Sequence, residues 1–271
     1  MADHAPAEPF FREAGSGCGV ICFHANASSS NQWRSLMERL AGDFHVLAAD
    51  AYGAGKSPTW TARRPLTLAD EVDLLDPLLS RTRAPLVLVG HSHGAAVALI
   101  AALRHPARVR ALALYEPTLF SLLDAETPPP NAADGIRATV ATASQALANQ
   151  DLAAAAECFI DYWMGAGAWR QTPEARKPAI VASMVNLPNW ANALMNDPTP
   201  LEAFERLDVP VLYMTGQHSP ASSLAVARLL TGALPDVRRV DFPGLGHMGP
   251  ITDPEPVNAE IERFLAGLQR C

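Results

Sequence analysis

The sequence Gly90-His91-Ser92-His93-Gly94 directly follows the apolar run Leu86-Val87-Leu88-Val89 and directly precedes an alanine-rich segment, 95–103. The apolar run is typical of a strand buried on both faces of a parallel sheet, and the segment after it is typical of a helix. A serine at a strained strand-to-helix turn needs neighbours without bulk near the backbone, and the two glycines provide them. The pattern therefore predicts a nucleophilic Ser92 above the carboxyl ends of the sheet, with an ordinary strand-to-helix turn as the alternative.

The rest of the chain repeats this alternation of short apolar runs and longer helical segments. Strands are expected at 19–23, 44–49, 109–114, 209–214 and 237–242, and helices at 33–40, 68–79, 222–234 and 254–268. Strands that alternate with helices form βαβ units with right-handed crossovers. We therefore predict an α/β fold with a mostly parallel, doubly wound sheet.

The stretch between Pro117 and Leu207 breaks this rhythm. It contains no strand pattern, and helical patterns cover 136–148, 152–164 and 173–185. We expect a core domain made of residues 1–117 and 207–271. A helical cap, or lid, of residues 118–206 is expected as an insertion after the strand that ends at Glu116.

The composition is that of a chain with a large buried core. Hydrophobic residues make up 49% and charged residues 18% of the 271 residues, which argues against disorder. The net charge of -7 and the lack of a polybasic stretch argue against nucleic-acid and membrane partners. The longest apolar run, 94–103, is half the length of a spanning helix, and residues 1–9 lack the pattern of a signal peptide. We expect a cytoplasmic protein that acts on a small molecule; the sequence leaves its oligomeric state open, a homodimer included.

Three motifs suggest a metal or a cofactor, but the neighbouring sequence lacks the residues that would complete each site. Cys18 and Cys22 have the spacing of metal ligands, but no second Cys/His pair answers them. Gly55-Lys56-Ser57 resembles the end of a phosphate-binding loop, but the first glycine of that motif would fall at Asp50. The glycines of 244–249 fit a dinucleotide pattern, but too few residues follow them for the rest of a βαβ unit. We therefore expect neither a metal nor a cofactor.

His247, in the segment 244–250, is the candidate base for Ser92. A serine hydroxyl near neutral pH is a weak nucleophile and needs an adjacent base. The segment follows the last expected strand, so the histidine comes after the nucleophile in the chain. His91 and His93 flank Ser92, and the turn is expected to point their side chains elsewhere.

The acid that would orient His247 is not at the strand before the last, where it is usually found. That strand ends in the segment 214–220, in which Ser219 occupies the position of the usual carboxylate. Glu116 ends the strand after the nucleophile helix and can reach the same imidazole, so we choose it as the acid. The alternatives are a dyad without a strong acid, or Asp241 or another carboxylate as the acid, with Glu116 as a helix-capping or hinge residue.

Two backbone N–H groups are needed to stabilise a tetrahedral oxyanion. One is expected from His93, the residue after the nucleophile. The loop after the first expected strand reads His24-Ala25-Asn26-Ala27-Ser28. We expect the amide of Asn26 to supply the second N–H group.

Together these segments resemble the α/β-hydrolase superfamily, in its capped, esterase-like and dehalogenase-like branch. The loop 24–26 is similar to the family's His-Gly oxyanion loop, with Ala25 in place of the usual glycine. The segment 50–57 is similar to the family's Asp-x-x-Gly-x-Gly-x-Ser turn. The segment 90–94 resembles its nucleophile elbow, and Gly246-His247 resembles its histidine loop.

The loop 24–30 also resembles that of the haloalkane dehalogenases, some of which have a Glu acid at the position of Glu116. Those enzymes use an Asp nucleophile, whereas this chain has Ser92, and serine suits acyl transfer. The resemblance implies a cofactor-independent serine hydrolase that cleaves a small, largely apolar ester, thioester or lactone. A carbon–carbon bond hydrolase or a perhydrolase-like enzyme would use the same residues. Ser219 at the usual acid position supports another class, a low-turnover ligand receptor.

The cap is expected to supply an apolar substrate pocket. Its candidate residues are Phe120, Trp163, Trp169 and Met184. The alternative is that these four side chains form the core of the cap itself.

Overall fold

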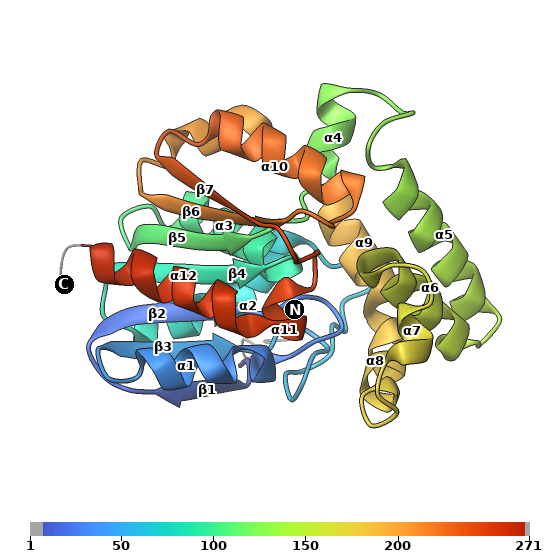
Figure 1. Cartoon of the computed structure of the whole chain (residues 1–271), viewed down its shortest axis with the longest axis horizontal. Coiled ribbons are helices and arrows are strands. Elements are labelled where there is room, and N and C mark those ends of the chain that lie inside the picture. The colour runs from blue at the N-terminus through green and yellow to red at the C-terminus, as the bar shows by residue number, and fades with distance from the viewer. Residues whose placement is uncertain (1–7, 269–271) are drawn as a thin grey trace.

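Seven strands form one sheet within residues 8–268, which are the residues that the computed structural model describes (Figure 1). The strands are β1 (Phe11–Ala14), β2 (Cys18–Phe23), β3 (Phe44–Ala49), β4 (Leu86–His91), β5 (Val109–Tyr115), β6 (Val211–Gly216) and β7 (Val237–Phe242). Their order across the sheet is β1-β3-β2-β4-β5-β6-β7. β1 runs antiparallel to β3, and every other neighbouring pair is parallel. The predicted α/β fold with a mostly parallel sheet is confirmed.

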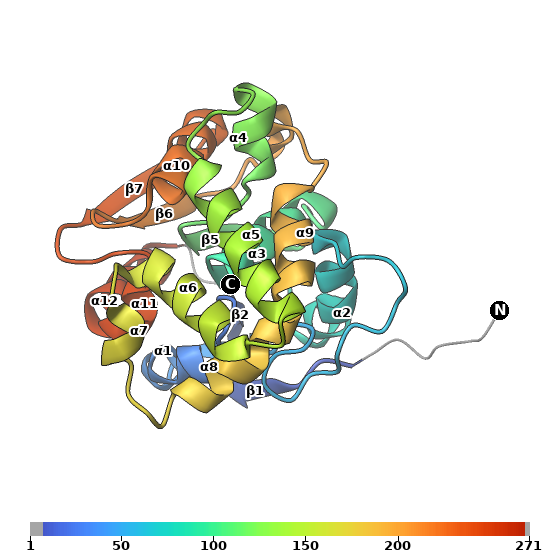
Figure 2. The same cartoon turned by 90° about the vertical axis from the view of Figure 1, so that its right-hand side faces the viewer.

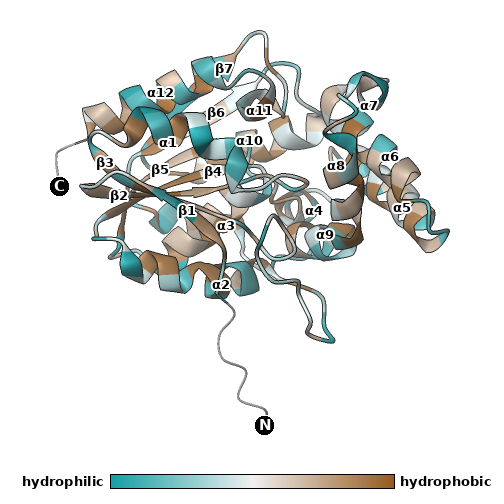
Figure 3. Ribbon diagram, turned by 90° about the horizontal axis from the view of Figure 1, so that it is seen from below, coloured by the Kyte–Doolittle hydropathy of each residue, from teal (hydrophilic) through white to brown (hydrophobic). Residues whose placement is uncertain are grey.

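Helices cover both faces of the sheet. One face carries α1 (Arg34–Leu40) and α12 (Pro254–Gly267), and the other carries α2 (Leu68–Arg81), α3 (His93–Arg104) and α10 (Ala221–Ala233). Successive residues of a strand point to opposite faces, so that in β4 Leu88 packs on the α3 side whereas Val87 and Val89 pack on the α1 side. Figure 3 shows the mostly brown sheet between α1 and α12 on one side and α2 on the other. This double coverage explains why the strands are continuous apolar runs.

The structure adds one strand and several short helices to the expected elements. β1 was not expected because Phe11-Arg12-Glu13-Ala14 contains no apolar run. It lies at the edge of the sheet and is only partly buried, so its sequence needs no such run. The short additions in the core are the 3-10 helix η1 (Ser30–Trp33) and the helix α11 (Gly249–Thr252).

Within the described residues, the chain between β5 and β6 forms helices and no strand. These are α4 (Ser121–Glu126), α5 (Asp134–Ala148), α6 (Leu152–Met164), α7 (Ala168–Gln171), α8 (Lys177–Ser183), η2 (Met184–Asn186), α9 (Leu187–Met195) and η3 (Leu201–Arg206). We call residues 118–206 the helical insert. Figures 1 and 2 show it across the end of the sheet at which the parallel strands finish. The extent of this segment as a cap domain stays a prediction.

The helical insert rests on the sheet through apolar side chains. A single hydrophobic cluster contains Leu99 of α3, Phe159 of α6 and Leu194 of α9, so the core continues from the α3 face into the insert. Because the two parts share one hydrophobic core, packing holds the insert in place above the ends of the strands.

Among residues 8–268, no helix combines the length and the apolar character that a membrane crossing requires. The same residues contain no group of three or more His, Cys, Asp or Glu side chains that could hold a metal ion. Cys22 is a buried free thiol within β2.

Candidate active site

Ser92 occupies a strained turn between β4 and α3. Its backbone has φ 57° and ψ -119°, a left-handed conformation that costs a non-glycine residue about 1–3 kcal/mol. Close packing enforces the turn: a Cβ atom on Gly90 would lie 2.4 Å from the Cα of Ala95, and one on Gly94 would lie 2.2 Å from the carbonyl oxygen of Phe23. Both glycines are therefore required for the turn that presents the Ser92 hydroxyl.

Ser92, His247 and Glu116 form a continuous hydrogen-bonded chain. The Nε2 atom of His247 lies 2.8 Å from Ser92 Oγ, and its Nδ1 atom lies 2.6 Å from Glu116 Oε2. The other carboxylate oxygen of Glu116 accepts from the Ser219 hydroxyl at 2.5 Å and from the Gly216 N–H at 2.7 Å. These three donors replace the water that the fully buried carboxylate has lost.

The alternative acid, Asp241, lies elsewhere. Its carboxylate accepts hydrogen bonds from the Thr215 hydroxyl and, at 2.9 Å, from Arg239 Nε at the exposed edge of β7. Ser219, at the position of the usual carboxylate, donates a hydrogen bond to Glu116. The structure therefore brings Glu116, and not Asp241, to His247.

Backbone strain is concentrated around these residues. Among residues 8–268, four non-glycine residues have positive φ, and three of them are Ala27 (55°), Ser92 (57°) and Glu116 (45°). Ala27 lies in the loop after β2, Ser92 in the turn after β4, and Glu116 directly after β5. Conformations of this kind persist only where surrounding contacts impose them, and they cluster at functional sites.

Buried side chains hold the loop after β2 in place. His24 accepts the N–H of Ala51 at Nε2 (3.0 Å) and donates from Nδ1 to the carbonyl of Ala25 (2.7 Å). Burial lowers the pKa of His24, which keeps the ring neutral and able to make both contacts. Asp50 accepts the N–H of Ser30 at 2.6 Å. The loop is thus tied to the segment after β3.

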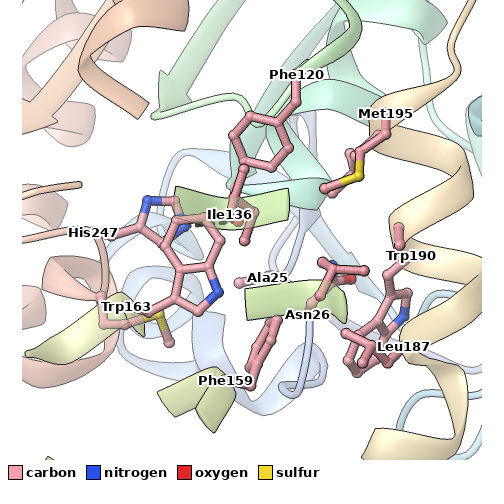
Figure 4. A pocket seen from close by; sticks show the side chains of 15 residues that line it. Ala25, Asn26, Phe120, Ile136, Phe159, Trp163, Leu187, Trp190, Met195 and His247 are labelled. Carbon is pink, nitrogen blue, oxygen red and sulfur yellow. Dashed lines mark hydrogen bonds between the residues drawn. The ribbon is translucent and has the colours of Figure 1, made fainter. Parts of the chain in front are cut away.

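The two predicted oxyanion donors belong to segments that meet at Ser92. Asn26 and Ser92 line the same cavity (Figure 4). His93 is the first residue of α3, and N–H groups in the first turn of a helix have no carbonyl partner within the helix. Both N–H groups are therefore candidates to bind an oxyanion.

Ser92 and His247 face a narrow cavity of about 450 Å³, its open mouth included, beneath the helical insert (Figure 4). Of its 15 lining residues, only Asn26, Ser92 and His247 are polar. The apolar ones are Ala25, Phe120, Ile136, Val140, Phe159, Trp163, Leu187, Trp190, Ala191, Leu194, Met195 and Met248. The cavity is therefore an apolar space with three polar side chains in its wall.

Two of the four predicted pocket residues, Phe120 and Trp163, line this cavity. Trp169 and Met184 are not among the residues that line it. Trp169 packs inside the helical insert with the Lys177 ammonium 5.3 Å from its ring centre. Met184 is fully buried. These two side chains fill the core of the insert, which was the stated alternative.

The helix α9, which the sequence patterns did not predict, supplies five of the lining residues. They are Leu187, Trp190, Ala191, Leu194 and Met195. Their spacing of three and four residues is that of one face of an amphipathic helix, and this signal is present in the sequence. Pro188 and two asparagines interrupt the apolar residues of α9 and weaken its helical pattern in the sequence.

Residues 20–254 match the family model described as "alpha/beta hydrolase fold". The chain belongs to this family. The resemblance inferred from the sequence motifs is thus confirmed at the level of the superfamily.

Full-length relatives of this α/β hydrolase include two curated enzymes. The 2-(acetamidomethylene)succinate hydrolase of Mesorhizobium japonicum is 29% identical over 263 residues, covering 94% of this chain and 90% of the relative. The pimeloyl-[acyl-carrier protein] methyl ester esterase of Edwardsiella ictaluri is 26% identical over 263 residues, covering 95% and 97%. The crystal structure of an alpha/beta hydrolase from Sphaerobacter thermophilus aligns with a TM-score of 0.73 at 25% identity, covering 96% and 99%. The chain is therefore similar to hydrolases over 94–96% of its length.

His91 links two loops of the α/β hydrolase, a role that the sequence did not reveal. Its Nε2 donates to the carbonyl of His247 (2.8 Å), and its Nδ1 accepts from the Gln32 amide (3.1 Å). The amide oxygen of Gln32 in turn accepts the N–H of Ala25 (3.1 Å). Burial holds the pKa of His91 well below its ordinary value, so the ring stays neutral. The histidine loop and the loop after β2 are thereby joined.

A second buried acid, Glu71 of α2, lies behind the Ser92 turn. Its Oε1 is 3.9 Å from His93 Nε2, and neither atom has a hydrogen-bond partner among the described residues. Its Oε2 accepts the N–H of Tyr52 at 3.2 Å. Burial raises the pKa of Glu71 to about 8 and lowers that of His93 to about 3. Both side chains are therefore neutral at pH 7.

We expect Glu71 to contribute to the free energy of unfolding of this α/β hydrolase, and we expect that contribution to decrease as the pH rises from 5 to 8. Below the ordinary pKa of 4.5 the carboxyl is protonated in both states, and the contribution is fully present. Above it the unfolded chain releases the proton while the native state keeps it up to about pH 8, so stability is lost by up to about 1.4 kcal/mol per pH unit.

The measurement is urea unfolding of the wild type, Glu71→Gln and Glu38→Gln at pH 5.5 and 7.5. Glu71→Gln cannot ionise, so its stability should depend less on pH than that of the wild type. Glu38 is exposed, and its variant should keep the wild-type dependence. Equal pH dependence in Glu71→Gln and the wild type would contradict the assignment.

Proposed function

We propose that this protein is a serine hydrolase that cleaves a small, largely apolar ester, thioester or lactone through an acyl-enzyme. The observation that carries the proposal is the unbroken hydrogen-bonded chain from Ser92 through His247 to Glu116 at the end of an apolar cavity. Ser92 Oγ attacks the acyl carbon while His247 Nε2 takes its proton. Glu116 holds the imidazole in the required tautomer and stabilises the imidazolium.

The developing oxyanion is bound by the N–H groups of His93 and Asn26. Donors that are already oriented toward the developing charge stabilise it without reorganising. His247 then passes its proton to the leaving group, which departs as an alcohol or thiol. Next, His247 removes a proton from water, the resulting hydroxide attacks the acyl carbon, and Ser92 is released with its proton restored. The cycle moves only protons and the acyl group.

The helical insert acts as the lid of this site. Its side chains from α5, α6 and α9 form most of the apolar wall, so a bound acyl group would be shielded from water. Shielding strengthens the hydrogen bonds at the reacting atoms. The fifteen lining residues carry no fixed charge, and this favours an acyl group that is itself uncharged.

The lack of charge in this wall favours a substrate that differs in charge from that of one relative. The Mesorhizobium japonicum enzyme is named for 2-(acetamidomethylene)succinate, which carries two carboxylate groups. A carboxylate buried without a partner loses several kcal/mol of hydration. The pimeloyl-[acyl-carrier protein] methyl ester esterase of Edwardsiella ictaluri is named for the cleavage of an ester, the reaction type of the proposal.

The nucleophile is tested with a fluorophosphonate probe, which phosphonylates an activated serine. The wild type should be labelled, and it should turn over short-chain p-nitrophenyl esters. Ser92→Ala should lose both properties because the attacking oxygen is gone. The exposed Ser80→Ala is the matched control and should behave like the wild type. Persistent labelling of Ser92→Ala would remove Ser92 from the mechanism, and an unlabelled, inactive wild type would favour the receptor alternative.

The acid is tested by Glu116→Gln, which keeps the shape and removes the charge. We expect kcat for p-nitrophenyl butyrate to fall by about 10³- to 10⁴-fold, because the imidazolium loses its partner and the tautomer is no longer fixed. Asp241→Asn, at the alternative acid, should stay within a few-fold of the wild type. The assignment is wrong if the two variants are equally active or if Asp241→Asn is the impaired one.

The charge of the acyl group is tested with two esters of equal chain length, p-nitrophenyl hexanoate and the p-nitrophenyl half-ester of adipic acid. We expect kcat/KM for the anionic half-ester to be lower by about 10²-fold or more, because its carboxylate enters an apolar wall. Met195→Lys places a cation in that wall and should narrow the ratio, whereas Met195→Leu should preserve it. Similar kcat/KM values for the two esters in the wild type would contradict an apolar acyl site.

A further inference from the structure

The indole of Trp163 lies flat against the proposed base. Its ring centre is 4.0 Å from that of His247, and the two planes are inclined by 26° (Figure 4). Trp163 belongs to α6 of the helical insert, whereas His247 belongs to the loop after β7. His247 is 1% exposed, and the indole covers one face of its ring. A side chain of the insert is therefore in direct contact with the imidazole.

Aromatic neighbours restrain the position of Trp163. Phe120 stacks on it with ring centres 6.3 Å apart and planes inclined by 21°. Phe159 packs edge-on against it at 6.1 Å. The preceding residue, Tyr162, shares a 2.7 Å hydrogen bond with Ser222 in the first turn of α10. The segment of α6 that carries the indole is thus tied to α10.

The other neighbours of the imidazole belong to β4 and the turn after it, to the end of β5, and to α10. Glu116, after β5, is the ionised group at its Nδ1 edge, and Ser92, after β4, lies at its Nε2 edge. Ser223 of α10 places its hydroxyl 3.4 Å from Nδ1. His91 of β4, which is neutral, lies 5.3 Å away between ring centres. Trp163 is thus the aromatic ring stacked on the face of the His247 imidazole, and Glu116 is the carboxylate at its edge. Both can stabilise the protonated imidazole.

An indole face binds a cation more strongly than a neutral ring, because its electron density is concentrated above and below the plane. His247 alternates between neutral imidazole and imidazolium in the proposed cycle. A face-on indole therefore stabilises the protonated form, which accompanies the tetrahedral intermediate. Glu116 acts in the plane of the ring, whereas Trp163 acts perpendicular to it, and the two effects are separable by substitution.

We propose that Trp163 is a positioning residue for His247: it restrains the imidazole and favours its protonated form, so that the docked helical insert sets the strength of the base. This inference rests on the proposed role of His247. In this arrangement the base is completed by the same helix that closes the acyl pocket. Withdrawal of α6 would leave a weaker and less restrained base.

The kinetic test is the pH profile of kcat/KM for p-nitrophenyl butyrate in the wild type, Trp163→Phe and Trp163→Leu. Loss of the indole removes a contact that favours the imidazolium, so the acidic limb should move to lower pH. We expect a shift of about half a pH unit or more in Trp163→Leu and a smaller one in Trp163→Phe, which keeps an aromatic face. Trp190→Leu removes an indole from the same cavity that does not stack on His247, and it should leave the limb in place. An unshifted limb in Trp163→Leu overturns the proposal.

The stack also has a signature that does not require turnover, because a protonated imidazole in contact with an indole quenches its fluorescence. The difference in tryptophan emission between the wild type and Trp163→Phe should fall as the pH is lowered and the imidazole becomes protonated. His247→Gln should abolish that fall, and a fall that persists in this variant overturns the proposal. Fluorophosphonate labelling of each variant separates the two hypotheses. An unlabelled wild type that still shows the quenching refutes the hydrolase function alone, whereas a labelled, active wild type with an unmoved limb refutes the role of Trp163.

Discussion

The fully buried carboxylate of Glu116 is the constraint on which the candidate site depends. A negative charge without access to water needs donors from several directions, and here they come from His247, Ser219 and the Gly216 N–H. These donors belong to the loop after β7 and to the end of β6, while Glu116 itself follows β5. Three neighbouring strands are thus fastened together at their carboxyl ends. Glu116 holds the imidazole of His247 at Nδ1, and this places the opposite atom, Nε2, within hydrogen-bond distance of Ser92.

Much of the fold follows from local patterns in the sequence. Runs such as Leu86-Val87-Leu88-Val89 predict strands that are covered on both faces, and two packed faces are what the structure contains. The weak patterns failed: β1 is a partly buried edge strand, and α9 carries a proline and asparagines among its apolar residues. The order of Ser92, Glu116 and His247 along the chain leads to one site because strand ends of a parallel sheet share an edge.

The walls of the site could be predicted only in part, because helical periodicity does not tell which apolar face meets the sheet and which meets another helix. Phe120 and Trp163 face the cavity, whereas Trp169 and Met184, of similar character, pack within the helical insert. The partners of His91 and Glu71 were also beyond sequence reasoning. Gln32 and His93, which face them, are distant in the sequence and belong to elements brought together only by packing.

The bridge through His91 has a mechanical consequence. The path from the Ala25 N–H through Gln32 and His91 to the His247 carbonyl joins two loops that are more than 200 residues apart in the chain, and every contact in it is between neutral groups. Neutral hydrogen bonds are little affected by ionic strength, so the bridge keeps its length when the salt concentration changes. The bridge therefore restrains the spacing between the loop that carries the candidate oxyanion donor and the loop that carries the candidate base.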